Sequence, residues 1–215
     1  MAYVAFVVEA PPPDDGFRRG MVAHLARLDA NIPDGAALFL GSSSIQGLAV
    51  ADVAANAANL GIGGETIPEL KQRMSGYTSL PRARLVVLAI GYNDLCCQPP
   101  DRALAAYPAL LARIPASTPL VISGVQEGAE NPSPAATRTF NAGLRALCAA
   151  RAPCAFVDIA ALLDTPARRD RYAADGVHLS AAGYAAWKQA LRQAIASLGA
   201  SLGTPLDPPA TRAGG

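Results

Sequence analysis

Short apolar runs alternate with stretches of helical spacing along most of the chain. The runs 37–40 and 85–90 each lead directly into a glycine, which is typical of a buried strand that ends in a sharp turn. The run 85–90 is aliphatic throughout, as expected of a central parallel strand that is covered on both faces. The strands that this pattern predicts are 37–40, 56–60, 85–90, 120–125 and 155–159.

Helices are predicted between these strands. Apolar residues recur at helical spacing in 17–29, where Asp14 or Asp15 can cap the helix, and Pro68 lies near the first turn of a helix over about 65–77. The other predicted helices are 101–114, 135–150, 160–163 and 180–198. Strands that alternate with helices form right-handed crossovers and a parallel sheet. The predicted fold class is therefore α/β, a flavodoxin-like three-layer α/β/α sandwich with a parallel sheet of about five strands.

The length and the composition fit one globular domain. A chain of 215 residues with 51% hydrophobic and 16% charged residues can bury a continuous core. We expect an N-terminal extension over 1–16, a domain over 17–198 and a flexible tail over 199–215, which is rich in Gly, Pro and Ala. The apolar start of the chain lacks the basic region of a signal peptide, and no apolar run reaches the roughly 18 residues of a membrane span. These features favour a cytoplasmic protein.

The net charge and the cysteine spacing argue against binding of nucleic acid, of an anionic membrane and of a metal. The net charge of +1, without a basic block, gives no footprint for nucleic acid or for an anionic membrane. Cys96 and Cys97 are adjacent, and no cysteine or histidine spacing indicates a metal site, so neither a metal nor another cofactor is expected. Only Cys148 and Cys154 are suitably spaced for a bridge, and the absence of an export signal favours reduced thiols.

Polar clusters follow three successive predicted strands at their carboxyl ends. Ser42–Ser44 follow the first strand, Gly61–Gly64 the second and Gly91–Asp94 the third, whereas Asp175–His178 precede the last predicted helix. Because the ends of parallel strands meet at one edge of a sheet, the first three clusters should lie close together. This edge is the expected ligand site.

The clusters contain the groups that an acyl-transfer site needs. A serine is a poor nucleophile without an adjacent base, and His178 lies on a loop three residues after Asp175. Asp175 can accept the Nδ1 proton of His178 and so turn Nε2 toward the serine. The backbone N–H groups of Ser43 and Gly64 and the side-chain amide of Asn93 can form an oxyanion hole.

With these four clusters the chain resembles the SGNH, or GDSL-type, family of esterases and lipases. The blocks of that family carry, in order, a catalytic serine, an oxyanion glycine, an oxyanion asparagine in Gly-x-Asn-Asp, and an Asp-x-x-His pair. Their order and spacing agree with this chain from about residue 36 to residue 198. The matching stretches are Gly41–Ser43, Asn59–Gly64, Gly91–Asp94 and Asp175–His178.

The resemblance selects among neighbouring candidates. Alignment on the first block places the nucleophile at Ser43 rather than at Ser42 or Ser44. Ser42 then stands where the family usually has an aspartate, which removes a charge from the turn. In the second block, Gly64 aligns with the oxyanion donor, and Gly63 is the alternative.

Three further residues are candidates for the substrate pocket. Ser42 is one because of its place in the turn, and Tyr92 and Leu95 flank Asn93 closely enough to shape an acyl pocket. Ordinary loop packing explains Tyr92 and Leu95 equally well. Asp94 is expected to brace the loop that carries Asn93.

The resemblance implies a serine ester hydrolase that acts through an acyl-enzyme intermediate on a small-molecule ester. The stretch Gly61–Thr66 is similar to the acetylhydrolase-like branch, which implies short-chain, acetyl-type acyl groups. The alternatives are a carbohydrate O-acetyl esterase, an acyltransferase and, more remotely, a catalytically silent acyl- or carbohydrate-binding domain. A dinucleotide-binding GxGxxG motif fails at Thr66, and the nucleophile elbow of α/β-hydrolases fails at Ile45. The oligomeric state is not predicted.

Overall fold

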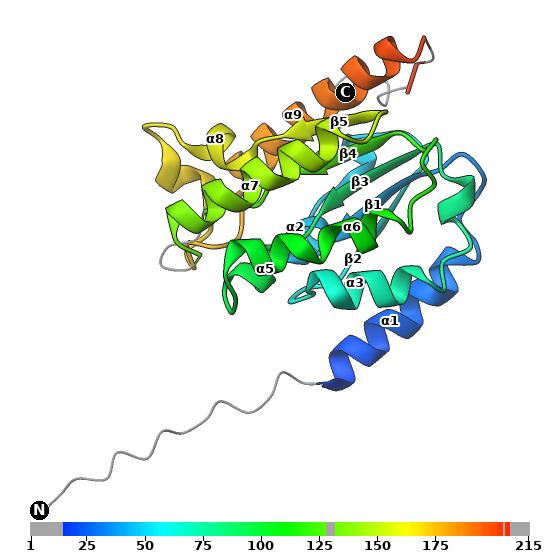
Figure 1. Ribbon diagram of the computed structural model, residues 1–215, viewed down its shortest axis with the longest axis horizontal. Helices are drawn as coiled ribbons and strands as arrows, with labels where there is room; N and C mark the ends of the chain where they lie inside the picture. The colour runs from blue at the N-terminus through cyan, green and yellow to red at the C-terminus, as the bar shows by residue number, and fades with distance from the viewer. Residues whose placement is uncertain (1–14, 128–131, 204, 207–215) are drawn as a thin grey trace, which may run out of the picture.

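Five strands form an all-parallel sheet in the computed structural model, which describes residues 15–127, 132–203 and 205–206. Their order across the sheet is β2-β1-β3-β4-β5, so the direction of winding reverses beside β1 (Figure 1). Ligands of open α/β sheets bind outside the carboxyl ends of the strands at such a reversal. The strands are β1 (Ala37–Gly41), β2 (Ala57–Gly61), β3 (Leu85–Ala89), β4 (Leu120–Ser123) and β5 (Cys154–Val157).

The register of the central strands sets three loops side by side. Gly41, the last residue of β1, pairs with Gly61 of β2 on one side and with Ala89 of β3 on the other. Beyond this point, the Ile62 N–H donates to the Gly41 carbonyl at 3.0 Å. The three polar clusters predicted from the sequence therefore leave the sheet at the same level.

Helices cover both faces of the sheet, as predicted (Figure 1). Side chains of β1 alternate between two cores, with Leu38 and Leu40 on one face and Ala37 and Phe39 on the other. The first core is covered by α1 (Asp15–Asp29), α3 (Ile67–Met74), α5 (Pro100–Ala105), α6 (Tyr107–Leu111) and α7 (Pro134–Ala149). The second is covered by α2 (Ser43–Gln46), α8 (Ile159–Leu163) and α9 (Ala181–Ser201).

The predicted helix 101–114 is wrong as a single element. The structure has two short helices there, because Pro108 cannot donate a backbone hydrogen bond and its ring crowds the preceding turn. One-turn elements that the sequence pattern did not predict complete the chain. They are α4 (Tyr92–Leu95), η2 (Leu80–Arg82) and η3 (Arg168–Arg171). Another short helical turn, η1 (Val50–Asp52), follows α2.

Two expectations near the C-terminus also need correction. Cys148 and Cys154 form a disulfide, because the short connection from α7 to β5 brings their Cα atoms to 5.4 Å. The expectation of reduced thiols at this pair is wrong. The tail does not begin at 199, since α9 continues through Ser201 and Leu206 is buried in the second core. The proposed cap at Asp14 lies outside the described residues.

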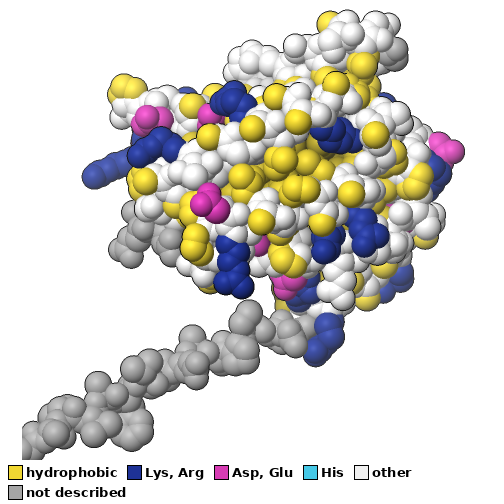
Figure 2. Space-filling model, viewed as in Figure 1, with side chains coloured by type: hydrophobic (Ala, Val, Ile, Leu, Met, Phe, Trp, Pro, Cys, Tyr) yellow, Lys and Arg dark blue, Asp and Glu magenta, His cyan; other side chains and the backbone are white. Residues whose placement is uncertain are grey.

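One face of the molecule agrees with the lack of a basic block in the sequence. On the face shown in Figure 2, acidic and basic side chains are scattered around an apolar centre. Within the part of the chain that the structure describes, none of the helices is long and apolar enough to cross a membrane.

Candidate active site

The serine cluster forms a sharp turn between β1 and α2. Gly41 has a φ of +158°, and a Cβ atom there would lie 2.0 Å from the Ala89 carbonyl oxygen, so only glycine fits. Ser43 opens α2 and is partly exposed, whereas Ser42 and Ser44 on either side are buried. The turn thus presents the hydroxyl of one serine out of three toward the surface.

Ser43, His178 and Asp175 form a continuous chain of hydrogen-bonding groups. The His178 Nε2 lies 3.1 Å from the Ser43 Oγ, and the His178 Nδ1 lies 2.7 Å from the Asp175 Oδ2. The other carboxylate oxygen of Asp175 accepts the backbone N–H groups of Val177 and His178, both at 2.9 Å. This Asx-type turn fixes the carboxylate relative to the ring that it orients.

The electrostatics of Asp175 suit that arrangement. The hydrogen bond from the His178 side chain, together with the two backbone N–H donors, lowers the pKa of the Asp175 carboxyl to about 2. The carboxylate therefore stays ionised at neutral pH and accepts a hydrogen bond from the N–H at Nδ1, which leaves Nε2 facing the serine.

The Gly61–Gly64 loop lies against the same turn. The Gly63 N–H donates to the Gln46 Oε1 at 2.7 Å, so this amide is committed to the end of α2. Gly64 adopts a left-handed φ of +75°. Gly63 donates its N–H to Gln46, whereas the N–H of Gly64 does not make this contact.

Asn93 is brought to this loop by a hydrogen bond that the sequence did not predict. Its Nδ2 donates to the Glu65 carbonyl at 2.8 Å, next to Gly64. An amide NH₂ has two hydrogens, and fixing one of them orients the second. Asp94, the next residue, is buried and accepts the Ile67 N–H at 3.0 Å, which braces the start of α3.

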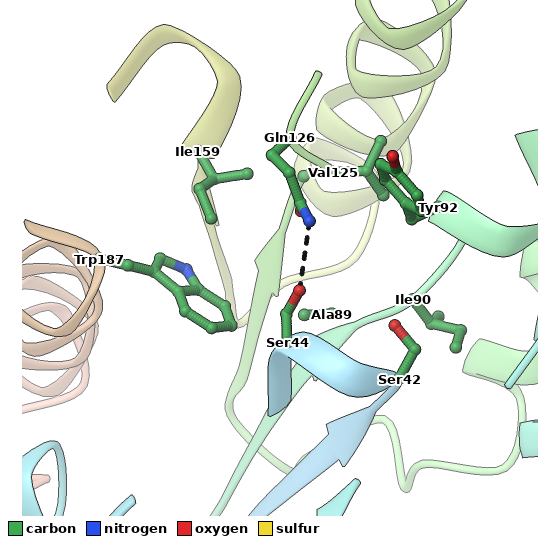
Figure 3. Close-up of a pocket in the computed structure, with 10 residues that line it drawn as sticks. Ser42, Ser44, Ala89, Ile90, Tyr92, Val125, Gln126, Ile159 and Trp187 are labelled. Carbon is green, nitrogen blue, oxygen red and sulfur yellow. Dashed lines mark hydrogen bonds between the residues drawn. The ribbon is translucent and has the colours of Figure 1, made fainter. Parts of the chain in front are cut away.

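Gln126, a residue that the sequence pattern did not single out, joins the serine turn to the histidine loop. Its Nε2 lies 3.4 Å from the Ser44 Oγ (Figure 3). The same Nε2 lies 3.2 Å from the carbonyl oxygen of Val177, one residue before His178. From the other side, the Tyr184 hydroxyl donates to the Ser44 carbonyl at 3.1 Å. Gln126 lies in a loop after β4 without a motif around it, so only tertiary structure reveals its position.

The family is decided by a match over most of the chain. The model of the GDSL-like Lipase/Acylhydrolase family matches residues 12–186 of this chain. The chain belongs to this family. As a GDSL-like acylhydrolase, it is a carboxylic ester hydrolase that acts on small-molecule esters.

Solved structures show the same fold as this GDSL-like chain. A protein from Streptococcus pneumonia, provisionally named a platelet activating factor, has a TM-score of 0.73 at 21% identity, covering 83% of this chain and 92% of its own. A GDSL-like lipase from Bacteroides thetaiotaomicron has a TM-score of 0.68 at 19% identity, with 84% and 98% covered. The acetylxylan esterase Axe2 from Geobacillus stearothermophilus has a TM-score of 0.59 at 20% identity, with 74% and 94% covered. None of the curated proteins matches the chain.

The pocket candidates of this GDSL-like site differ in their surroundings. Ser42, Tyr92 and Gln126 line a cavity of about 10 Å³ beside the serine turn, close to the minimum that one water needs (Figure 3). Ser42, in place of the aspartate that is usual in GDSL proteins, is thus one of the residues that line this small cavity. Leu95 does not line this cavity. It is buried in the first core, so ordinary packing explains it.

Asp94 gives a pH-dependent prediction. Burial raises the pKa of its carboxyl from 3.8 to about 6, so between these values the folded chain binds more protons than the unfolded chain. The contribution of Asp94 to stability is then fully present below about pH 4 and is lost as the pH rises through 6. Asp94→Asn keeps an acceptor for Ile67 without a charge. In thermal melts, the Tm of Asp94→Asn minus the Tm of the unchanged protein should increase from about pH 4 to about pH 7.5. A Tm difference that does not change with pH would contradict the assignment.

Proposed function

We propose that this hydrolase cleaves short-chain, acetyl-type esters through an acyl-enzyme intermediate on Ser43. The observation that carries the proposal is the linked geometry of Ser43, His178 and Asp175, with heavy-atom distances of 3.1 and 2.7 Å. These distances lie within the range at which a nucleophile and its base exchange a proton. The same geometry speaks against a silent binding domain, which has no need of it.

The proposed reaction has two halves. In the first, the Ser43 Oγ bonds to the ester carbonyl carbon while its proton passes to the His178 Nε2, and that proton then leaves with the alcohol as the C–O bond breaks. In the second, His178 takes a proton from water, the hydroxide attacks the acyl carbon, and the proton returns to the Ser43 Oγ as the acid departs. Asp175 holds the imidazole and stabilises its protonated form in both halves.

The negative oxygen of each tetrahedral intermediate needs fixed donors. We assign this role to the backbone N–H groups of Ser43 and Gly64 and to the second N–H of Asn93. Two hydrogen bonds support this assignment. The Gly63 N–H already donates to Gln46, and the Asn93 side chain is held by its hydrogen bond to the Glu65 carbonyl. Donors held in advance cost no reorganisation when the charge develops.

The small size of the cavity beside the serine turn supports a small acyl group. The cavity beside the turn has about 10 Å³, and Leu95 is packed in the core and does not line it. Carbohydrate O-acetyl esterase activity is the second candidate, because Axe2, one of the solved structures of this fold, is an acetylxylan esterase. Transfer of the acyl group to another hydroxyl uses the same residues.

A series of p-nitrophenyl esters tests the proposed acyl specificity. We expect kcat/KM to fall by at least about tenfold from acetate to butyrate and again to octanoate, because each added methylene has to be accommodated in a restricted site. Acetylated xylooligosaccharides, assayed for released acetate, test the second candidate. Faster turnover of octanoate than of acetate would contradict the short-chain assignment, and lack of turnover of every ester would contradict hydrolysis itself.

A further inference from the structure

A buried ion pair lies directly behind the loop that carries Gly64. Glu65 is fully buried, and Arg73 of α3 donates to both of its carboxylate oxygens at 2.6 Å, through Nε and Nη2. Arg18 of α1 adds a third charge, with its Nη2 3.7 Å from the Glu65 Oε1. Two parallel bonds between a guanidinium and a carboxylate fix the orientation of both groups.

The remaining donors of Arg73 tie the ion pair to the surrounding backbone. Nη2 also donates to the Leu60 carbonyl at 2.6 Å, and Nη1 donates to the Tyr77 hydroxyl. Leu60 belongs to β2, the outermost strand on its side of the sheet, so half of its carbonyls face away from the neighbouring strand. Arg73 thereby joins the end of β2, the turn after it and the far end of α3.

Glu65 in turn holds both groups that we assign to the oxyanion hole on this side. Gly64 is its covalent neighbour, and the Asn93 amide donates to its backbone carbonyl at 2.8 Å. A displacement of Glu65 therefore moves the Gly64 N–H and the anchor of Asn93 together. Neither Glu65 nor Arg73 needs to touch the substrate to have this effect.

Stability alone is a poor explanation for such a pair. Removing two charges from water is costly, and replacing a buried ion pair by apolar residues of similar size is often neutral or stabilising. Unlike apolar packing, the pair makes directional hydrogen bonds, and its four contacts fix one position of the loop.

We propose that Arg73, acting through Glu65, is a positioning residue that sets the oxyanion donors Gly64 and Asn93 in place for catalysis. This inference rests on the proposed function. The predicted signature is a loss in kcat with an unchanged KM, because the ground-state ester does not depend on the oxyanion donors as the transition state does.

The test replaces the pair in a way that leaves no unpaired charge, because Arg18 keeps its ion pair with the Glu69 Oε1 at 3.1 Å. Glu65→Leu combined with Arg73→Met keeps the backbone carbonyl that anchors Asn93. We expect a cooperative thermal melt, a fall in kcat for p-nitrophenyl acetate of about 10²-fold, and a KM within twofold of the unchanged protein. The control is Asp34→Leu combined with Arg82→Met, which removes a more exposed ion pair at the opposite ends of the strands and should leave kcat within twofold.

A third substitution separates positioning from a general loss of structure. If the pair acts through the oxyanion hole, Asn93→Ala should cost much less in the Glu65→Leu, Arg73→Met background than alone. Losses that simply multiply would overturn the proposal, as would an unchanged kcat in the folded double variant. If that variant does not melt cooperatively, Arg73→Lys replaces it under the same criteria, because a lysine cannot make the two parallel bonds and reach Leu60 as well.

The unchanged protein and Ser43→Ala are measured in the same series. Equal turnover by these two would show that the proposed function fails, whatever the ion-pair variants do. A large difference between them, with full turnover in the folded double variant, would overturn the positioning role alone.

Discussion

Ser43→Ala is expected to lower kcat for p-nitrophenyl acetate by about 10⁴- to 10⁶-fold. The Ser43 Oγ is the group that bonds to the acyl carbon, and an alanine leaves His178 and Asp175 without a nucleophile to activate. Residual turnover should come only from the oxyanion donors and from water that enters the site. Steady-state kinetics and a far-UV circular dichroism spectrum, which reports folding, check the result.

The neighbouring serines provide matched controls within the same turn. Ser42→Ala and Ser44→Ala remove hydroxyls that are buried, and Ser44 loses only its 3.4 Å contact with Gln126. Both should keep kcat within about tenfold of the unchanged protein. Full turnover by a folded Ser43→Ala, or complete loss in Ser42→Ala alone, would move the nucleophile away from Ser43.

Asn93→Ala is expected to lower kcat by about 10²- to 10³-fold with little change in KM. The substitution removes the donor that we assign to the oxyanion and also its 2.8 Å tether to Glu65. Because the charge on the carbonyl oxygen develops only as the Ser43 Oγ attacks, the lost interaction belongs to the transition state. Kinetics with p-nitrophenyl acetate across a range of concentrations separate the two constants.

The control for Asn93 is another asparagine at a structural position. The side chain of Asn31, just after α1, donates to the Arg27 carbonyl at 2.9 Å, far from the serine turn, so Asn31→Ala should turn over the ester at the unchanged rate. An Asn93→Ala variant that is folded and equally active would remove Asn93 from the oxyanion hole.

Much of the fold follows from local pattern. The segments 37–40, 56–60 and 85–90 indicate strands, because each is followed directly by a glycine turn and the first and third are apolar throughout. The prediction failed where one residue overrides a pattern, as Pro108 does by dividing the helix 101–114. It also failed at Cys148 and Cys154, whose pairing depends on how the chain folds back between α7 and β5.

The residues of the candidate site were likewise only partly predictable from the sequence. The family blocks bring Ser43, His178 and Asn93 to attention because their residue types match the needs of the chemistry. Gln126 and Arg73 carry no such signal, since a glutamine in a loop and an arginine on a helix are ordinary in any sequence. Their importance comes from the two or more segments that each of them joins, which only the tertiary structure shows.

The most direct test of the account is to find which atom forms the covalent intermediate. After incubation with a fluorophosphonate, which traps an activated serine, peptide mass spectrometry should place one phosphonyl group on Ser43 and none on Ser42 or Ser44. His178→Ala should remain unlabelled over the same time, because its serine is not activated. A label on another serine, or an active enzyme that takes up no label, would contradict the account.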